Sequence, residues 1–548
     1  MKKLYSEKKF SCFRELIDTC AQKYGAKAAF KIKIAENAYE KIPFSLFKKE
    51  FYGLCGHFLA LGLRGCRIAV IGKNSYEWIL SYLAAATVGV AVPLDKELGA
   101  EDIENFLLAA ECRLVCADAE SAAKIDAAHT CLAFSDARKT AERGAGEESD
   151  REVAALCPEA DAMQILIFTS GTTGRSKGVC LSQKNICSNI YSTVSMVKIR
   201  ESDTVLSILP LHHTYECTLD HLTVLSKGGC VTYAESLVKI AKNIAEYSPT
   251  ILVVVPELLK TLARRIKSKL AKDCPEKYRA LYRDLSLSEA LKKTPFIIRQ
   301  IIKHKVRKTL GGKLHTFIVG AADLDTALVE DFSALGIRTL QGYGLTECSP
   351  LLAGNNDFYF NPKSTGIAIP FVELKIDEPN AEGVGEILAK GENIMLGYYR
   401  DEEATQAVFR DGWFCTGDLG RMDPDGALYI TGRRKNIIVT ENGKNIYPEE
   451  LETRLSEFAE IGEVIVVADR TSGKTEVKAK IFPNLDFLRE KFGRELSDEE
   501  KESTIKKIVD FVNSKIPSYK HIRIVEVLKV ALEKTTTRKI KRFGANLS

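Results

Sequence analysis

A short apolar run that opens into a loop rich in hydroxyls and glycines most strongly constrains the fold of this chain. Residues Ile165 to Phe168 are strand-like, and the sequence from 165 to 178 reads ILIFTSGTTGRSKG. The loop offers five Ser/Thr hydroxyls, three glycines and Lys177. Glycines let backbone N–H groups turn toward a ligand and hydroxyls add donors, so the loop suits a polyphosphate. Its spacing differs from the GxxxxGK(S/T) loop, and a flexible loop without a ligand is the alternative.

Strand-like and helix-like segments alternate along most of the chain. Arg67 to Ile71 is strand-like and precedes a helical pattern from Tyr76, and Ile251 to Val255 precedes another from Leu258. Alternation of this kind predicts parallel α/β sheets. We expect an exposed loop at Gly144 to Asp150, which is rich in Gly, Glu and Ser.

The pattern changes near Gly432, after which short and highly charged helices and strands predict a separate small domain. At 548 residues the chain is long enough for at least two domains with buried cores. We therefore divide it into residues 1–432 and residues 433–548.

Composition argues against secretion and against a membrane span. The N-terminus is basic, but no apolar run follows it as a signal peptide would require. The most apolar stretch, Trp78 to Leu94, contains Gly89 and Pro93 and is short for a membrane helix. We expect a cytoplasmic protein whose 15 cysteines are reduced, because the sequence contains no CxxC pair.

One group of residues has a metal-like spacing. His213, Cys217 and His221 recur at helical steps of four, but no fourth ligand is visible nearby in the sequence. We interpret the three as one face of a core or pocket-lining helix.

One segment carries most of the positive charge. Between Lys260 and Lys313 the chain has 17 Lys/Arg against 4 Asp/Glu, a local charge of +13, whereas the whole chain carries +5. Apolar residues recur there at helical steps, which predicts amphipathic helices with a cationic face. We expect residues 260–313 to contact an anionic membrane peripherally, on its inner face. A solvated helical face is the alternative, and nucleic acid is not expected because no binding motif accompanies the charge.

Five ordered segments resemble those of the adenylate-forming (AMP-binding) superfamily, which includes acyl-CoA synthetases, luciferases and the adenylation domains of peptide synthetases. The first is the loop at 169–177, which is similar to the family's phosphate loop. The others resemble its adenine and magnesium segment, ribose-binding turn, inter-domain hinge and C-terminal lysine motif: Gly342-Tyr343-Gly344-Leu345-Thr346-Glu347, Thr416-Gly417-Asp418, Gly432-Arg433-Arg434-Lys435 and Thr537-Arg538-Lys539-Ile540.

The resemblance implies an α/β fold. It comprises a large N-terminal domain, with two doubly wound α/β subdomains and a distorted β-barrel, and a small α+β C-terminal domain. The implied activity is that of an ATP-dependent acid:CoA ligase, in which a carboxylate attacks the α-phosphorus of ATP, pyrophosphate leaves, and acyl-AMP then passes its acyl group to CoA. ATP, Mg²⁺ and CoA are therefore the expected cofactors.

The family's pattern assigns roles to the matching residues. The residues implied for polyphosphate binding are Thr169, Ser170, Gly171, Thr172, Thr173, Gly174 and Lys177. Those implied for adenine binding are Gly320, Ala321, Ala322, Gly342, Tyr343 and Gly344, with Tyr343 stacked on the base. Thr346 approaches the α-phosphate, and Glu347 helps to hold Mg²⁺. Asp418 accepts the ribose hydroxyls, with Arg433 near the nucleotide.

The small domain carries the residues implied for the switch between the two steps. Lys539 is the adenylation lysine, and the domain then rotates about a hinge at Lys435. Gly443 belongs to a segment that resembles the hairpin lining the thiol tunnel, close to the pantetheine of CoA. The chain departs from the family pattern at four positions, none of which removes a charge-bearing catalytic group: Ser176, Gln183, Asn436 and Arg538.

The acid substrate is inferred from Leu209-Pro210-Leu211-His212-His213, which resembles the substrate motif of fatty acyl-CoA synthetases and places His213 near the carboxylate. Together with the basic helical stretch, this favours the bacterial long-chain fatty acid:CoA ligases. The alternatives are a ligase that loads a carrier-protein thiol, amino-acid adenylation, and a non-catalytic acyl- or nucleotide-binding protein. Lys539 and Glu347 argue against the last, since a binder needs neither.

Overall fold

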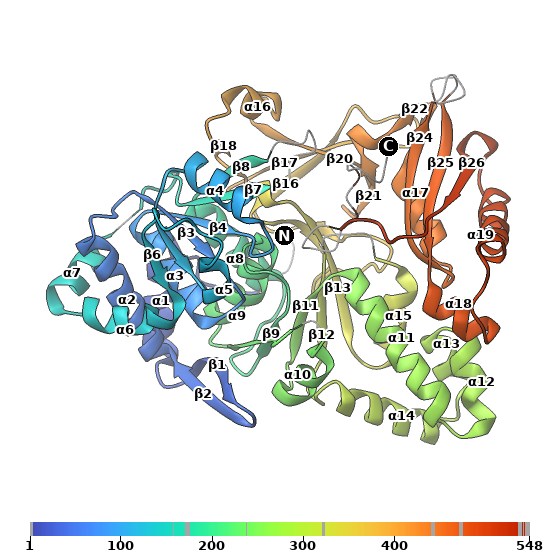
Figure 1. Ribbon diagram of the computed structural model, residues 1–548, viewed down its shortest axis with the longest axis horizontal. Helices are drawn as coiled ribbons and strands as arrows, with labels where there is room; N and C mark the ends of the chain where they lie inside the picture. Colours follow the sequence, from blue (N-terminus) through green and yellow to red (C-terminus); the bar gives the residue numbers. More distant parts are fainter. Residues whose placement is uncertain are drawn as a thin grey trace. The chain divides into compact units, whose positions relative to one another are not determined.

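The structure is a computed structural model of the whole chain (Figure 1), described here for residues 4–156, 158–169, 176–236, 238–320, 324–439, 444–470, 475–534, 540 and 542. The chain divides into two compact units. The large unit comprises Met1–Glu373 and Ala389–Phe414, and the small unit comprises Leu374–Leu388 and Cys415–Ser548.

The first sheet of the large unit has nine strands within the described residues. In spatial order they are β15 (Ile367–Ala368), β14 (Leu351–Gly354), β13 (Arg338–Gly344), β12 (Thr316–Val319), β11 (Ile251–Val254), β9 (Thr204–Ser207), β10 (Cys230–Tyr233), β1 (Ala28–Ala35) and β2 (Ala38–Pro43). The strands from β13 to β1 run parallel, and antiparallel strands close both edges. The carboxyl ends of the parallel strands therefore meet at one edge of the sheet.

The second sheet, counted over the same described ranges, has seven strands. In spatial order they are β18 (Gly397–Tyr398), β8 (Lys177–Leu181), β7 (Ile165–Thr169), β4 (Val90–Leu94), β3 (Arg67–Ile71), β5 (Cys112–Ala117) and β6 (Cys131–Ala133). The strands from β7 to β6 are parallel, whereas β8 and β18 are antiparallel additions.

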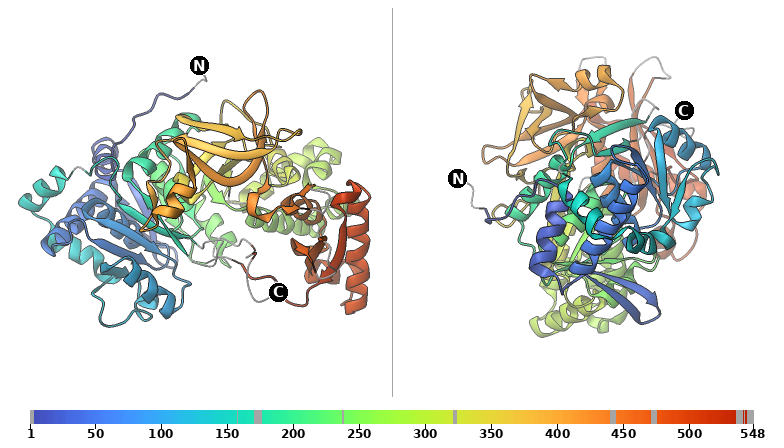
Figure 2. Two further views of the ribbon diagram at one scale, coloured as in Figure 1. Left: turned by 90° about the horizontal axis from the view of Figure 1, so that it is seen from above. Right: turned by 90° about the vertical axis from the view of Figure 1, so that its left-hand side faces the viewer.

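Helices connect the strands of both sheets, as Figure 2 shows from two further sides. Those of the large unit are α1 (Phe13–Tyr24), α2 (Phe44–Ala60), α3 (Tyr76–Val88), α4 (Ala100–Ala109), α5 (Ala119–Ala122), α6 (Phe134–Gly144), α7 (Glu147–Ala155), α8 (Gln183–Met196), the π-helix η1 (Tyr215–Leu222), α9 (Thr223–Ser226), α10 (Ile240–Tyr247), α11 (Pro256–Asp273), α12 (Glu276–Asp284), α13 (Leu287–Lys293), α14 (Phe296–Thr309), α15 (Thr326–Ala334), the 3-10 turn η2 (Thr346–Cys348) and α16 (Glu402–Ala407). In β3, Ala69 and Ile71 share a buried cluster with Ile103 and Leu107 of α4. The alternate residues of β3 face the opposite side, where α3 packs.

A third sheet is ordered β16 (Val372–Asp377), β17 (Gly385–Gly391), β20 (Trp413–Met422) and β19 (Phe409–Arg410), with β21 (Leu428–Arg433) paired antiparallel to β20. The remaining elements of the small unit are the 3-10 turn η3 (Arg434–Asn436), β22 (Ile438–Val439), β23 (Asn445–Ile446), α17 (Pro448–Ser456), β24 (Ile461–Asp469), β25 (Glu476–Pro483), α18 (Leu485–Phe492), α19 (Asp498–Asn513), the 3-10 turn η4 (Ser518–Lys520) and β26 (Ile522–Val527). Strands β24, β25 and β26 form one sheet, whose apolar side chains share a core with α17 and α19.

The α/β class is confirmed, and several sequence-based boundaries fall within a residue or two. Strand Arg67–Ile71 and the helix that begins at Tyr76 are as predicted. The run Trp78 to Leu94 is the buried helix α3 followed by the buried strand β4. Among the described residues, no helix is both long enough and apolar enough to cross a membrane. None of the 14 described cysteines is in a disulfide, and most of them are buried.

The prediction of an exposed loop from Gly144 to Asp150 is wrong. Helix α6 continues to Gly144 and α7 begins at Glu147, with acidic residues in its first turn and Val153 buried on its inner face. Acidic side chains near a helix N-terminus are favourable. The Gly, Glu and Ser composition therefore marked a helix start rather than an irregular loop.

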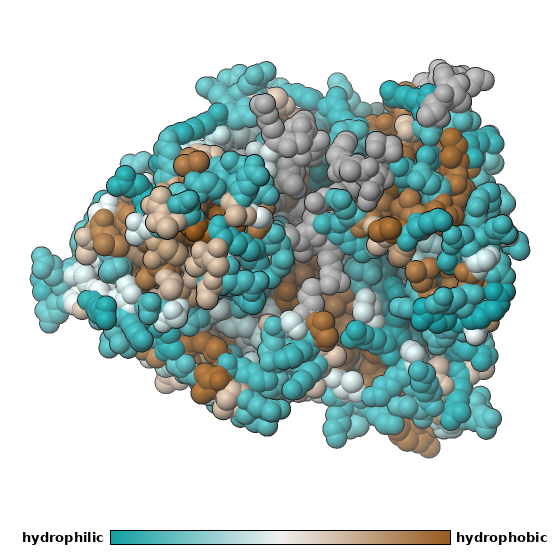
Figure 3. Space-filling model, in the orientation of Figure 1, coloured by the Kyte–Doolittle hydropathy of each residue, from teal (hydrophilic) through white to brown (hydrophobic). Residues whose placement is uncertain are grey.

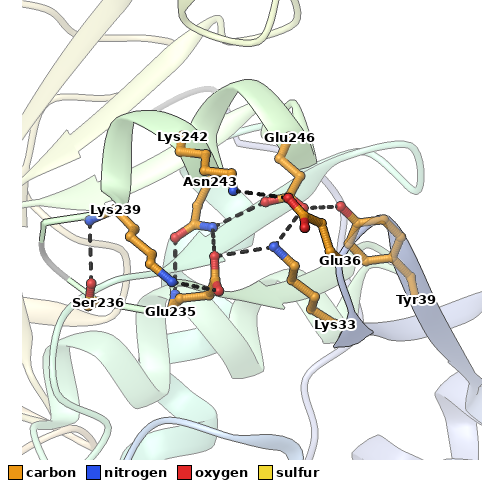
Figure 4. Close-up of polar contacts among 9 residues, drawn as sticks. All are labelled: Lys33, Glu36, Tyr39, Glu235, Ser236, Lys239, Lys242, Asn243 and Glu246. Carbon is orange, nitrogen blue, oxygen red and sulfur yellow. Dashed lines mark hydrogen bonds and ion pairs between the residues drawn. The ribbon is translucent and has the colours of Figure 1, made fainter.

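A polar network attaches the β1–β2 hairpin to α10 (Figure 4). Lys33 Nζ lies 2.9 Å from Glu246 Oε1 and 3.3 Å from Glu235 Oε2. Asn243 Nδ2 donates to Glu235 Oε2 at 2.9 Å. This amide and the neighbouring Lys239 and Lys33 ammonium groups lower the pKa of Glu235 to about 2. The network holds an edge hairpin whose own strands could form only a marginally stable pair.

Candidate active site

The loop at residues 169–177 joins two paired strands. Thr169 at the end of β7 faces Lys177 at the start of β8, and Thr169 Oγ1 donates to the Lys177 carbonyl at 3.4 Å. The antiparallel pairing therefore brings both ends of the loop together. The other residues expected to bind polyphosphate lie outside the described residues: Ser170, Gly171, Thr172, Thr173 and Gly174.

Tyr398 links Lys177 with Glu347, which sequence reasoning had placed in separate motifs. Lys177 Nζ lies 4.6 Å from the centre of the Tyr398 ring. The Tyr398 hydroxyl donates to Glu347 Oε1 at 3.1 Å. Burial, and then the Glu347 carboxylate, hold the pKa of Tyr398 well above its usual value, so the phenol keeps its proton and donates.

Backbone pairing fixes the position of Tyr398. Strand β18 pairs antiparallel with β8, with Tyr398 opposite Val179. The Tyr398 amide donates to Thr405 Oγ1 at 2.8 Å. The strand beside the loop thus determines where the phenol points.

The turn after Glu347 is held by two buried amides, Asn189 of α8 and Asn393. Each donates from Nδ2 to the carbonyls of Cys348 and Leu351, at 2.9–3.3 Å for Asn189 and at 2.9–3.0 Å for Asn393. Four hydrogen bonds from two side chains satisfy carbonyls that a tight turn would otherwise leave unpaired. The Glu347 carboxylate is therefore presented from a fixed backbone.

Gly344 allows the approach of two chain segments at this turn. A side chain there would place its Cβ 1.9 Å from the Pro350 carbonyl oxygen, and the Leu345 amide donates to that same oxygen at 2.8 Å. Only glycine accommodates such a contact. Thr346 and Glu347 follow after Leu345, in η2.

The residues expected around adenine stand at the carboxyl ends of two neighbouring parallel strands. Gly320 follows β12, and Gly342, Tyr343 and Gly344 end β13, which pairs with β12. A Cβ at Gly320 would lie 3.1 Å from the Tyr215 ring, so the glycine leaves room for that ring. Tyr343 is half-buried. Ala321 and Ala322 lie outside the described residues.

His213 lies in the turn after β9. Its amide donates to the Pro210 carbonyl at 3.1 Å, and its ring centre lies 4.0 Å from that of His212. Burial, with a smaller effect of the Lys96 ammonium, lowers the pKa of His212 to about 3, so that imidazole is neutral at physiological pH. Asn74 fixes the turn, because its Nδ2 donates to the Leu209 carbonyl at 2.6 Å.

In the small unit, Asp418 and Arg433 face each other across β20 and β21. Arg433 Nε lies 2.8 Å from Asp418 Oδ1, and Asp418 is 4% exposed. Thr416 Oγ1 accepts from the Asp418 amide at 3.1 Å, and Gly417 takes a positive φ of 71° between them. The ion pair holds the Asp418 carboxylate beside Arg433.

Lys435 lies in η3, directly after the Asp418–Arg433 pair. Burial, and then the Arg433 guanidinium, lower the pKa of Lys435 to about 8. The expected catalytic Lys539 and the expected tunnel residue Gly443 lie outside the described residues. On either side of Lys539, Lys534 pairs with Ile540 in an isolated β-bridge, and Arg542 Nη1 donates to the Val466 carbonyl at 3.2 Å.

The structure therefore brings together Lys177 and Glu347 in the large unit, and Asp418 and Arg433 in the small unit. Sequence reasoning missed Tyr398, Asn189, Asn393 and Asn74. Each acts through a contact with a residue that is distant in the sequence, and no motif among the five contains any of them.

Comparisons with known proteins agree with one another. The family described as AMP-binding enzyme matches residues 17–399. The long-chain-fatty-acid–CoA ligase FadD15 of Mycobacterium bovis is 29% identical over 440 residues, which cover 75% of this chain and 72% of that protein.

Two solved structures share the fold over nearly the whole length. The fatty acyl CoA synthetase of Mycobacterium tuberculosis superposes with a TM-score of 0.67 at 22% identity, covering 97% of each chain. ATP-bound MatB from Rhodopseudomonas palustris superposes with a TM-score of 0.74 at 23% identity, covering 96% of this chain and 97% of that one.

Proposed function

Because the chain belongs to the AMP-binding enzyme family, we propose that it is an ATP-dependent acid:CoA ligase that acts on long-chain fatty acids. In the first step a carboxylate oxygen forms a bond to the α-phosphorus, the bond to the β-phosphate bridging oxygen breaks, and pyrophosphate leaves. In the second step the CoA sulfur attacks the acyl carbon and AMP leaves. The similarity to FadD15 of M. bovis, which is named a long-chain-fatty-acid–CoA ligase, supports this choice of acid and thiol.

The observation that carries the proposal is the connection of Lys177 to Glu347 through Tyr398. Lys177 supplies a cation at the mouth of the loop, where it binds the β- and γ-phosphates. Tyr398 occupies Oε1 of Glu347 and orients the carboxylate, so that Oε2 is the oxygen available to Mg²⁺. One protein carboxylate with phosphate oxygens is a usual magnesium environment. When bound, the metal neutralises charge on the phosphates as pyrophosphate departs.

The other expected residues complete the nucleotide site in this proposal. Thr346 donates to the α-phosphate, Tyr343 stacks on adenine beside Gly320, and Asp418 accepts hydrogen bonds from the ribose hydroxyls. The close approach at Gly344 and the hydrogen bond from the Leu345 amide to the Pro350 carbonyl support the role of Thr346, since they restrain the backbone just before it. Preorganised donors of this kind lower the barrier because they need no reorganisation during the reaction.

We also propose that residues 433–548 move as a domain about Lys435. Lys539 then bridges the acyl carboxylate and the α-phosphate during adenylation, and Gly443 lies at the thiol tunnel during transfer. The contacts that flank Lys539, from Lys534 and Arg542, support a segment anchored on both sides of the lysine.

The test is release of pyrophosphate and formation of thioester across a panel of acids. We expect release with long-chain fatty acids, and acyl-CoA only when CoA is added. Acyl-AMP that transfers to a carrier-protein phosphopantetheine but not to CoA would favour the carrier-loading alternative. Release that depends on amino acids would favour amino-acid adenylation, and ATP binding without release under any condition would favour a non-catalytic protein.

We further propose that the protein is cytoplasmic and binds peripherally to anionic membrane through residues 260–313. Helix α14 supports this, because Phe296, Ile297 and Ile301 are 64%, 73% and 60% exposed on a basic helix. An apolar patch lies over α14 at the lower edge of Figure 3. Each basic residue near an anionic surface contributes about 1 kcal/mol, so a few contacts hold the protein there.

Co-sedimentation with phosphatidylcholine vesicles, with and without phosphatidylglycerol, tests the membrane contact. We expect binding to the anionic vesicles that salt weakens and that replacement of Phe296, Ile297 and Ile301 by serine removes. Replacement of the exposed Leu61 and Leu108 by serine is the matched control and should leave binding unchanged. Equal binding to both vesicle types would contradict the proposal.

A further inference from the structure

Three ionisable side chains lie buried together on the π-helix η1, apart from the residues proposed for ATP and acid. Glu216, Asp220 and His221 are each 0% exposed. One ligand atom from each lies within 4.8 Å of the others. His221 Nδ1 is 3.4 Å from Asp220 Oδ2. Carboxylate and imidazole groups that converge in this way are metal-ligand types.

The π-helix creates the cluster. Its i→i+5 bonding places residues i, i+4 and i+5 on one side, which is the spacing of Glu216, Asp220 and His221. In an α-helix His221 would point about 140° away from Glu216 around the axis. Thr223 Oγ1 donates to the Thr218 carbonyl at 2.8 Å where the π-helix ends. Single π-helical turns within α-helices often mark functional sites.

The polar atoms of the cluster have few partners. Apart from the 3.4 Å contact between His221 Nδ1 and Asp220 Oδ2, in the part of the chain that the structure describes no hydrogen bond reaches Glu216 Oε2, either oxygen of Asp220 or either ring nitrogen of His221. Glu216 Oε1 is satisfied, by the Ser207 hydroxyl at 2.7 Å and the Ile208 amide at 3.0 Å. Tyr233, whose ring centre lies 5.6 Å from that of His221, has an unpartnered hydroxyl among the same described residues. Burial of so many unpaired groups is costly unless a ligand satisfies them.

The two carboxylates of the cluster favour a cation as its ligand. Two ionised carboxylates in an apolar interior require a compensating cation. A dication with both carboxylates and a neutral imidazole gives a site without net charge.

We propose that Glu216, Asp220 and His221 bind one divalent transition-metal ion of the zinc class. Bonds of 2.0–2.1 Å around a tetrahedral ion give ligand atoms about 3.3 Å apart, close to the Asp220–His221 separation. The ion has a structural role. It fixes Glu216, whose Oε1 already joins η1 to the end of β9, from which the turn carrying His213 departs.

Elemental analysis of the tag-free protein, purified without chelator, tests the site. We expect about one equivalent of zinc or another transition dication per chain, retained through gel filtration because the site is buried. Asp220→Asn and His221→Gln should each lose it. His315→Gln is the matched control, since His315 Nε2 also contacts an aspartate, Asp203, at 3.2 Å. That variant and Glu347→Gln should keep the metal.

A second measurement on the wild type does not depend on whether the variants fold. Protein unfolded and refolded with a chelator should melt at a lower temperature than the purified protein, and zinc, but not magnesium, should restore the melting temperature. If the purified protein contained no metal and zinc did not change its melting temperature, the proposal would be overturned in favour of a protonated carboxyl pair. Full metal content in His221→Gln would also overturn it.

Discussion

The Tyr398 hydroxyl donates a 3.1 Å hydrogen bond to Glu347 Oε1, from a strand that begins 50 residues after the Glu347 turn. The same ring supports the Lys177 ammonium. A neutral phenol therefore joins a cation to a carboxylate. In the proposed reaction the Lys177 ammonium binds the phosphates, and one oxygen of the Glu347 carboxylate binds the metal.

Tyr398→Phe removes that hydrogen bond and keeps the ring beneath Lys177. A hydrogen bond to a charged group contributes about 1.5–3 kcal/mol, so we expect adenylation to slow roughly tenfold or more when Mg²⁺ is limiting. Pyrophosphate exchange measured over a range of Mg²⁺ checks this. Tyr399→Phe, which alters the neighbouring residue, should change little.

Glu347→Gln keeps the shape of the side chain and removes the charge that faces the metal. We expect adenylation to fall roughly a hundredfold, with a weaker dependence on Mg²⁺, because one preorganised electrostatic contact is lost. The measurement is again pyrophosphate exchange at limiting Mg²⁺. A wild-type rate there would remove Glu347 from the proposed site, and Glu373→Gln serves as the surface control.

Asn189→Ala removes two of the four hydrogen bonds that hold the turn after Glu347. The carbonyls left behind are buried, so we expect a loss of about 2 kcal/mol in the free energy of unfolding and slower adenylation. Urea denaturation measures the first effect. Gln406→Ala, on an exposed helix, should change the free energy of unfolding by less than about 0.5 kcal/mol. An equal loss of stability in both variants would contradict the role of Asn189 in holding the turn.

Lys539→Ala and Gly443→Leu should separate the two half-reactions. Lys539→Ala should lose acid-dependent adenylation, by about a hundred- to a thousandfold, yet still convert supplied acyl-AMP and CoA to thioester. Gly443→Leu should form acyl-AMP and fail at transfer, because its side chain obstructs the proposed tunnel. If Lys539→Ala impaired both steps equally, or neither, the rotating two-step mechanism would be wrong.

Glu235→Gln tests the network of Figure 4 through its pH dependence. The pKa of Glu235 is lowered to about 2 from an unfolded value near 4.5, so its carboxylate stabilises the fold above pH 4.5 and loses that effect as pH falls toward 2. We expect the variant to be less stable than the wild type at pH 7, with a difference that shrinks at pH 3. Urea unfolding at pH 7 and pH 3 measures the difference in the free energy of unfolding. A difference that grows in acid would contradict this prediction.

Much of the fold could be predicted because its parallel strands are buried on both faces. Such strands read as continuous apolar runs, and β3, β7 and β11 were located from that pattern alone. The helix start at Glu147 was missed because its acidic first turn resembles a solvated loop in composition. The π-helix also escaped, since His213, Cys217 and His221 were read at α-helical steps while the structure groups Glu216, Asp220 and His221.

The candidate site was predicted as far as local motifs reach. Glu347, Asp418 and Lys177 stand within short recognisable segments, whereas Tyr398 becomes part of the site only when β18 pairs with β8. A two-residue strand has no periodicity to detect. Asn189 is likewise a helical residue whose role depends on a turn about 160 residues further along the chain.

The two parallel sheets of the large unit are interleaved along the chain. The nine-stranded sheet takes strands from before and after the segment that forms most of the seven-stranded one, which is completed by β18. At a synthesis rate of about 5–20 residues per second, roughly 20–70 s pass between the emergence of β1 and that of β18. Until β15 has emerged, shortly before β18, both sheets have incomplete apolar surfaces. The nascent chain should therefore depend on chaperones during its synthesis, and no fragment that ends before β18 should fold as an independent half.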